Sequence, residues 1–105
     1  MTELDVTPEA LLAASAQVDA LTARLVAANA VHAAATATIL PPGSDAPSVK
    51  VAALLIGHGG AHEASAAMGN EELLRSGLGV AESGISYLCG DTEGAAALGA
   101  AGGVV

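Results

Sequence analysis

Two histidines and a glutamate in the middle of the chain have the spacing of a metal-binding cluster. His58 and His62 are four residues apart, so on a helix they would share one face, and Glu63 follows directly. Imidazole nitrogens and carboxylate oxygens are common Zn²⁺ ligands in proteins. However, Gly59 and Gly60 weaken a helix at this point, and no third ligand is evident on the same face. We therefore expect a solvated or partner-facing histidine pair, with a metal-binding module as an alternative.

The other reactive side chains match no known catalytic pattern. The chain lacks the nucleophile elbow of hydrolases, the His-Glu-x-x-His zinc motif and the phosphate-binding Gly-x-x-x-x-Gly-Lys loop. Its single cysteine, Cys89, has no internal disulfide partner, so we expect an idle or buried thiol, while an intermolecular disulfide remains open. The sequence thus predicts a non-enzymatic protein without a cofactor.

Tyr87 and Asp91 form a second pair with helical spacing. They are four residues apart, so on a helix a phenol and a carboxylate would lie one turn from each other. A receptor could recognise this aromatic surface and this anion together. Alternatively, Tyr87 merely packs and Asp91 is a solvated charge near a helix end. The spacing alone does not decide between these two interpretations.

The composition limits both the size of the core and the class of partner. The chain has 105 residues, no Trp or Phe and a single Tyr, and alanine makes up much of its 52% hydrophobic content. A single domain of this size is near the lower limit for a self-sufficient core, so we expect another chain to complete it. Eleven acidic residues against three basic ones, Arg24, Lys50 and Arg75, give a net charge of −8. Nucleic acid and anionic lipid are therefore excluded as partners, because both are bound by clusters of Lys and Arg.

Neither of the most hydrophobic stretches predicts a membrane span. The run Val51–Ile56 is six residues long, and the segment Ala95–Val105 is short and weakly hydrophobic against roughly 30 Å of hydrocarbon. The acidic N-terminus also lacks the basic and apolar regions of a secretory signal peptide. We expect a soluble chain without a Sec signal.

The first helix is predicted over about residues 8–39. Thr7 can cap its free N–H groups, Pro8 suits the first helical position, and Glu9 complements the positive end of the helix dipole. The next residues form a stripe whose steps alternate between three and four, as in a coiled coil, and in which His32 is expected to be a hydrogen-bonded core position. The stripe comprises Leu11, Ala14, Val18, Leu21, Leu25, Ala28, His32, Ala35 and Ile39.

A proline-rich loop over residues 40–47 separates this helix from a second one, over about residues 48–89, which Asp45 or Ser48 can cap. Seven glycines in the second helix, at roughly 1 kcal/mol each, would make it unstable in isolation. It is therefore either kinked or broken with a flexible middle, or a long helix whose small residues let neighbours approach closely. Residues 92–105 are an Ala/Gly-rich segment that we expect to be a flexible tail, outside a domain of residues 1–91.

The predicted architecture is all-α, an antiparallel two-helix hairpin. No segment alternates with period two, so strands do not compete, and two helices leave apolar surface for helices of another chain. The sequence does not separate the residues that seal the hairpin from those that face a partner. The candidates for both roles are Leu11, Val18, Leu21, Leu25, Ile56, Leu74, Leu78, Ile85 and Leu88.

The order of four features over residues 6–96 resembles the mycobacterial PE family. Pro8 and Glu9 match the Pro-Glu pair that names the family, and an alanine-rich helix, a Pro-Pro loop and a longer helix follow. Tyr87 and Asp91 match the Tyr-x-x-x-Asp/Glu export signal of type VII secretion substrates. Residues 21–25 and 80–88 are most similar to the short, PE-domain-only member encoded with the third ESX system.

This resemblance implies a one-to-one complex with a PPE protein, a four-helix bundle with two helices from each chain. An EspG-type chaperone would bind the PPE chain and thus contact this chain only indirectly. The ESX machinery would export the folded pair to the exterior or the cell surface, with a role in iron or zinc acquisition at the cell envelope. A Trp-x-Gly turn on the partner would complete the export signal, since this chain has no Trp. A self-associating scaffold that forms a homodimeric bundle is the alternative.

Overall fold

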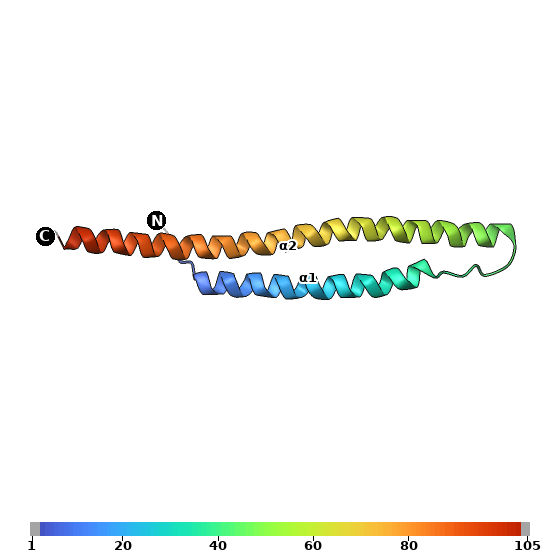
Figure 1. Cartoon of the computed structure of the whole chain (residues 1–105), viewed down its shortest axis with the longest axis horizontal. Helices are drawn as coiled ribbons and strands as arrows, with labels where there is room; N and C mark the ends of the chain where they lie inside the picture. Colours follow the sequence, from blue (N-terminus) through green and yellow to red (C-terminus); the bar gives the residue numbers. More distant parts are fainter. Residues whose placement is uncertain (1–2, 104–105) are drawn as a thin grey trace. The chain divides into compact units, whose positions relative to one another are not determined.

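The computed structural model describes residues 3–103, which form two helices, α1 (Pro8–Ala37) and α2 (Ala46–Gly102), and no strand (Figure 1). The contacts define two units, one formed by the chain up to Asp19 together with the chain from Arg75 on, the other by Ala20–Leu74. Each unit contains a segment of both helices. The predicted all-α class with two long helices is confirmed.

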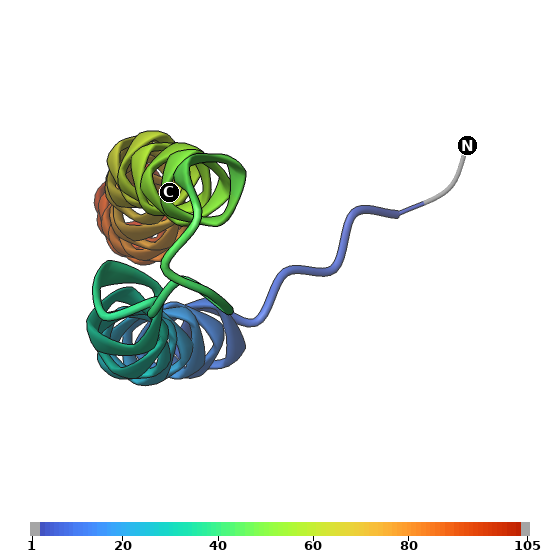
Figure 2. The same cartoon turned by 90° about the vertical axis from the view of Figure 1, so that its right-hand side faces the viewer.

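The start of α1 is fixed by Thr7 and Pro8. The carbonyl oxygen of Thr7 accepts hydrogen bonds from the backbone N–H groups of Ala10 at 3.0 Å and Leu11 at 3.2 Å. Thr7 is therefore the cap residue, and Pro8 occupies the first helical position, where its missing N–H costs no hydrogen bond. Residues 3–7 are not helical and extend away from the helix pair (Figure 2).

Asp45 caps the start of α2, which decides between the two predicted caps. Its carboxylate accepts hydrogen bonds from the Ser48 hydroxyl at 2.7 Å and the Ser48 backbone N–H at 3.1 Å. These two bonds favour the charged form and lower the pKa of Asp45. The helices are thus joined by residues 38–45, close to the predicted loop.

α2 is one continuous helix, and its glycines include the points where α1 lies nearest. A Cβ atom added at Gly77 would lie 3.1 Å from Val18, and one added at Gly84 would lie 3.2 Å from Leu11. In the other unit, a Cβ at Gly59 would lie 3.0 Å from Thr36. Glycine therefore allows the close approach of the two helices. The long helix with small residues at its interface, rather than a broken one, is the form that the structure adopts.

The contact surface between the helices, here called the seam, is polar at every seventh position of α1. Ser15 donates a hydrogen bond from Oγ to the carbonyl oxygen of Gly77 at 2.7 Å, and Thr22 is only 6% exposed. Asn29 and Thr36 are half-buried at the next two heptad positions. No large side chain of residues 3–103 is fully buried. The seam is therefore held by small and polar groups, with no core of bulky side chains.

The predicted stripe on α1, in which the sequence did not separate seam residues from partner-facing ones, coincides with this seam only in part. Leu11 and Val18 lie in the seam and are half-buried, but Leu21, Leu25 and His32 are exposed. The seam follows the polar residues of α1 because the facing surface of α2 contains glycines. Where the helices lie this close together, the space between them accommodates short side chains. The bulkier residues are left on the outside.

α2 continues to Gly102, whereas the sequence predicted a helix end near residue 89 and a flexible tail from residue 92. No proline interrupts residues 90–102, and alanine, the strongest helix former, occupies five of these positions. The Thr92 hydroxyl donates a hydrogen bond to the Leu88 carbonyl oxygen at 2.8 Å, within the helix. No helix end therefore marks the domain boundary predicted at residue 91, which stays a prediction, and residues 104 and 105 of the predicted tail lie outside the described residues.

By length and composition, α1 is apolar enough to cross a membrane. The sequence pointed to two other segments instead, because the hydrophobicity of α1 is spread over many alanines that are each only weakly hydrophobic. Only 6% of its most apolar window is buried in the chain itself. α1 thus has an extended apolar surface that the described part of the chain leaves uncovered.

Alanine substitutions at two glycines of α2 should separate helix propensity from close packing. Gly69→Ala meets nothing within 4 Å and should raise the free energy of unfolding by about 1 kcal/mol. Gly84→Ala places its Cβ 3.2 Å from the Pro8 carbonyl oxygen, a backbone atom that cannot rotate away, and should lose this gain or destabilise the protein. Urea unfolding of both variants, each purified in complex with the partner chain that the resemblance implies, is followed by circular dichroism. Equal stabilisation by the two substitutions would contradict the close approach at Gly84.

Candidate functional site

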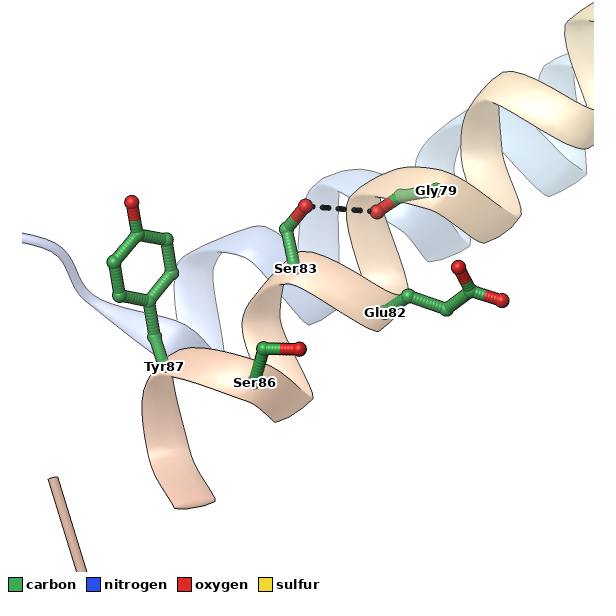
Figure 3. Close-up of a pocket in the computed structure, with 5 residues that line it drawn as sticks. All are labelled: Gly79, Glu82, Ser83, Ser86 and Tyr87. Carbon is green, nitrogen blue, oxygen red and sulfur yellow. Dashed lines mark hydrogen bonds between the residues drawn. The ribbon is translucent and has the colours of Figure 1, made fainter. Parts of the chain in front are cut away.

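Tyr87 and Asp91 both lie within α2, in the unit that contains the start of α1. Tyr87 is 41% exposed, and Asp91 is exposed as well. The phenol ring stands off the helix beside a shallow hollow of about 430 Å³ that Gly79 and Ser83 line from the preceding turns (Figure 3). The Ser83 hydroxyl donates a hydrogen bond to the Gly79 carbonyl oxygen at 2.9 Å. The small residues next to the ring leave it accessible.

The register of α2 places the two residues on the same face as the seam. Asp91 lies seven residues after Gly84, which faces Leu11 and Pro8, and Tyr87 lies seven residues after the half-buried Val80. Residues seven apart lie on nearly the same side of an α-helix. The pair therefore continues the face of α2 that packs against α1, beyond the point where α1 begins.

Pro8 and Glu9 are at the edge of this open face. Pro8 is buried, and its carbonyl oxygen would lie 3.2 Å from a Cβ added at Gly84. Glu9 is exposed in the first turn of α1, where a carboxylate complements the helix dipole. The two residues thus have the structural roles that the sequence predicted for a helix start, and Pro8 in addition packs on α2.

The nine apolar candidates divide into two groups by exposure. Leu11 and Val18 are half-buried and contact the seam glycines. The other seven leave 37–57% of their surface exposed; they are Leu21, Leu25, Ile56, Leu74, Leu78, Ile85 and Leu88. The hairpin therefore uses two of the nine candidates, and the remaining seven are available to another molecule.

A groove in the unit formed by Ala20–Leu74 contains two shallow hollows. The first, about 260 Å³, lies between Val26 on α1 and Ala67 and Leu74 on α2, and Thr22, Asn70 and Glu71 also line it. The second, about 230 Å³, lies between Ala33 on α1 and Ile56 on α2. Sequence reasoning missed this groove. The sequence signal that could have found it is the seven-residue repeat of polar side chains on α1. This repeat marks the seam, and residues beside the seam line the groove.

The histidine pair is exposed on α2 and has no companion ligands within the part of the chain that the structure describes. Among residues 3–103, no three His, Cys, Asp or Glu side chains lie close enough together to hold a metal ion. His58 and His62 are both exposed, Glu63 is half-buried, and Cys89 is an exposed free thiol. A metal at His58 and His62 would need ligands from another molecule.

The sequence profile of the PE family matches residues 4–97, nearly the whole chain. The chain belongs to the PE family. Two curated relatives are from Mycobacterium tuberculosis. The first, named PE family immunomodulator PE15, is 54% identical over 93 residues, which are 89% of this chain and 91% of the relative. The second, named PE family immunomodulator PE5, is 50% identical over 100 residues, 95% of this chain and 98% of the relative. No solved structure matches this chain.

The matched region includes α1, α2 as far as residue 97, the Pro8–Glu9 pair and the Tyr87–Asp91 pair. The matches cover 91% and 98% of the two relatives, which are thus about as short as this chain, so the resemblance to a PE-domain-only protein is confirmed. The names of these PE relatives state no catalytic activity. The link to the third ESX system stays a prediction.

Proposed function

We propose that this PE protein is a non-enzymatic type VII secretion substrate that is exported as a one-to-one complex with a PPE protein. The exposed apolar surface carries this proposal: large apolar side chains, among them seven of the nine candidates, are exposed on two helices whose own contact surface buries no large side chain fully among residues 3–103. A surface of this kind is stable in water when a second chain covers it. A PPE protein supplies two helices to complete a four-helix bundle.

Within this proposal, the groove of the Ala20–Leu74 unit seats a helix of the PPE chain. Each hollow has small and apolar lining residues, such as Ala67 and Leu74 in the first and Ala33 and Ile56 in the second, that would receive bulky apolar side chains of that helix. Glu71 lines the first hollow and Glu63 the second, so basic residues beside the inserted side chains would complement the groove.

Tyr87 and Asp91 form the export signal in this proposal, and a Trp-x-Gly turn of the PPE chain completes it. The ESX machinery exports the folded pair to the cell surface or the exterior, and an EspG-type chaperone binds the PPE chain beforehand. The exported pair acts at the cell envelope in iron or zinc acquisition. PE15 and PE5 are named immunomodulators, and a chain displayed outside the cell is placed for such a role.

Coexpression tests the partner class directly. The chain should be poorly soluble or aggregated when expressed alone, and it should form a soluble one-to-one complex with a mycobacterial PPE protein. Size-exclusion chromatography with light scattering measures the stoichiometry. A well-folded homodimer that binds no PPE protein would instead support the self-associating scaffold.

Filling the first hollow should weaken the pair without harming the hairpin. Ala67→Phe occupies the space near Val26 and Leu74, and overpacking of about 1–3 kcal/mol corresponds to binding that is weaker by roughly fivefold to 150-fold. Ala61→Phe is the matched control, because it is also exposed and lies about 120° away around the helix. Binding can be measured by isothermal titration with the PPE protein that copurifies with the natural chain. Equal affinities of the two variants would show that the groove is not part of the interface with the PPE chain.

The export signal can be separated from pairing by substitution. Tyr87→Ala and Asp91→Ala should each abolish export while the complex with the PPE chain remains intact, because neither side chain lies in the groove that is proposed to seat a PPE helix. Glu93→Ala controls for the loss of one negative charge two residues further on. Export is measured by immunoblotting of culture filtrate and cell-surface fractions, and pairing by copurification. Normal export of both variants would contradict the assignment.

A further inference from the structure

The position at which α1 begins determines how much of the α2 face is covered. Along the seam, Ser15 binds the carbonyl of Gly77, and one heptad toward the N-terminus Pro8 faces Gly84. Because the helices are antiparallel, one further heptad of α1 would face Asp91, and the turn in between would face Tyr87. These two residues are exposed because α1 stops at Pro8.

Pro8 is the residue that prevents α1 from extending over them. Proline has no N–H to donate to a carbonyl four residues earlier, and its ring disfavours the helical conformation of the preceding residue. In agreement with this, Thr7 is outside the helix and residues 3–7 diverge from α2 (Figure 2). None of Asp5, Val6 and Thr7 is a helix breaker, so this segment could become helical without the proline.

We propose that Pro8 is a positioning residue for the Tyr87–Asp91 pair: it ends α1 one heptad short, and the seam face of α2 that carries the pair stays open for recognition. Gly84 contributes by letting the Pro8 backbone lie directly on α2, which fixes where the uncovered face starts. An α1 longer by two turns would bury the phenol and place Glu3 and Asp5 near Asp91. The inference rests on the proposed export role of this pair.

Two N-terminal variants that differ only at residue 8 test the proposal. The first carries Asp5→Ala, Val6→Ala and Thr7→Ala and keeps Pro8, so α1 still cannot extend. The second carries the same three substitutions together with Pro8→Ala, so α1 can extend. Both are made in the full-length chain with Cys89→Ser, so that tetranitromethane modifies tyrosine without competing thiol oxidation, and both are purified with the PPE partner.

Three measurements are then compared. Hydrogen–deuterium exchange of residues 3–8 reports helix extension. Nitration of this chain, followed by intact mass, reports access to Tyr87 alone, because Tyr87 is its single tyrosine. Export and copurification are assayed as above. We expect the Pro8→Ala variant to gain protection, to be nitrated severalfold more slowly and to lose export while still pairing, whereas the variant that keeps Pro8 behaves as the natural chain.

Each other outcome overturns the proposal at an identifiable step. No gain of protection would show that Pro8 does not end α1. Protection with unchanged nitration or export would show that an extended α1 does not cover the pair. Equal loss of export in both variants would assign the effect to residues 5–7 instead. The failure of the proposed function is distinguishable, because normal export of Tyr87→Ala would refute the signal itself, while exchange and nitration would still test the role of Pro8.

Discussion

The close approach of two helices through glycine and short polar side chains is the constraint on which the other features depend. Where Gly77 and Gly84 face α1, the space between the backbones accommodates Ser15, Val18 and Leu11 but no layer of large side chains. The hydroxyl of Ser15 bonds to a backbone carbonyl and thereby fixes the register at the cost of apolar burial. The bulky residues must then lie outside, so the same packing that holds the helices together produces the surface that needs a partner.

The sequence predicts the elements well because local rules decide them. Pro8 and Thr7 define one helix start, Asp45 the other, and the proline-rich loop separates the helices. The end of α2 could not be predicted this way, because Ala/Gly-rich sequence is equally typical of disorder, and a helix of such residues has no strong stop before Gly102. For a related reason, the sequence left two interpretations of the glycines open. Helix propensity gives the stability that each glycine costs the helix, whereas only the structure shows that a neighbouring helix packs closely at these positions.

The identity of the seam could not be predicted from apolar periodicity. A search for large hydrophobic residues finds the strongest stripe, and in α1 that stripe includes Leu21 and Leu25, which are exposed. The hairpin instead uses the neighbouring stripe, where Ser15, Thr22 and Asn29 recur at intervals of seven. In a chain that folds alone the two stripes would coincide. Their separation in one helix is therefore a sequence signal of an incomplete bundle, and it is visible once polar periodicity is considered together with apolar periodicity.

The location of the Tyr87–Asp91 pair follows from the same geometry. A motif of two residues four apart can lie on any face of a helix, and nothing in its own spacing says which face it is. The heptad count from Val80 and Gly84 places it on the face that α1 covers elsewhere, so its exposure depends on the length of α1 and not on the motif itself. The Pro-Glu pair at one end of the chain and the Tyr-x-x-x-Asp pair at the other therefore belong to one structural unit. In this unit, the position of Pro8 determines how much of the α2 face around Tyr87 and Asp91 stays uncovered.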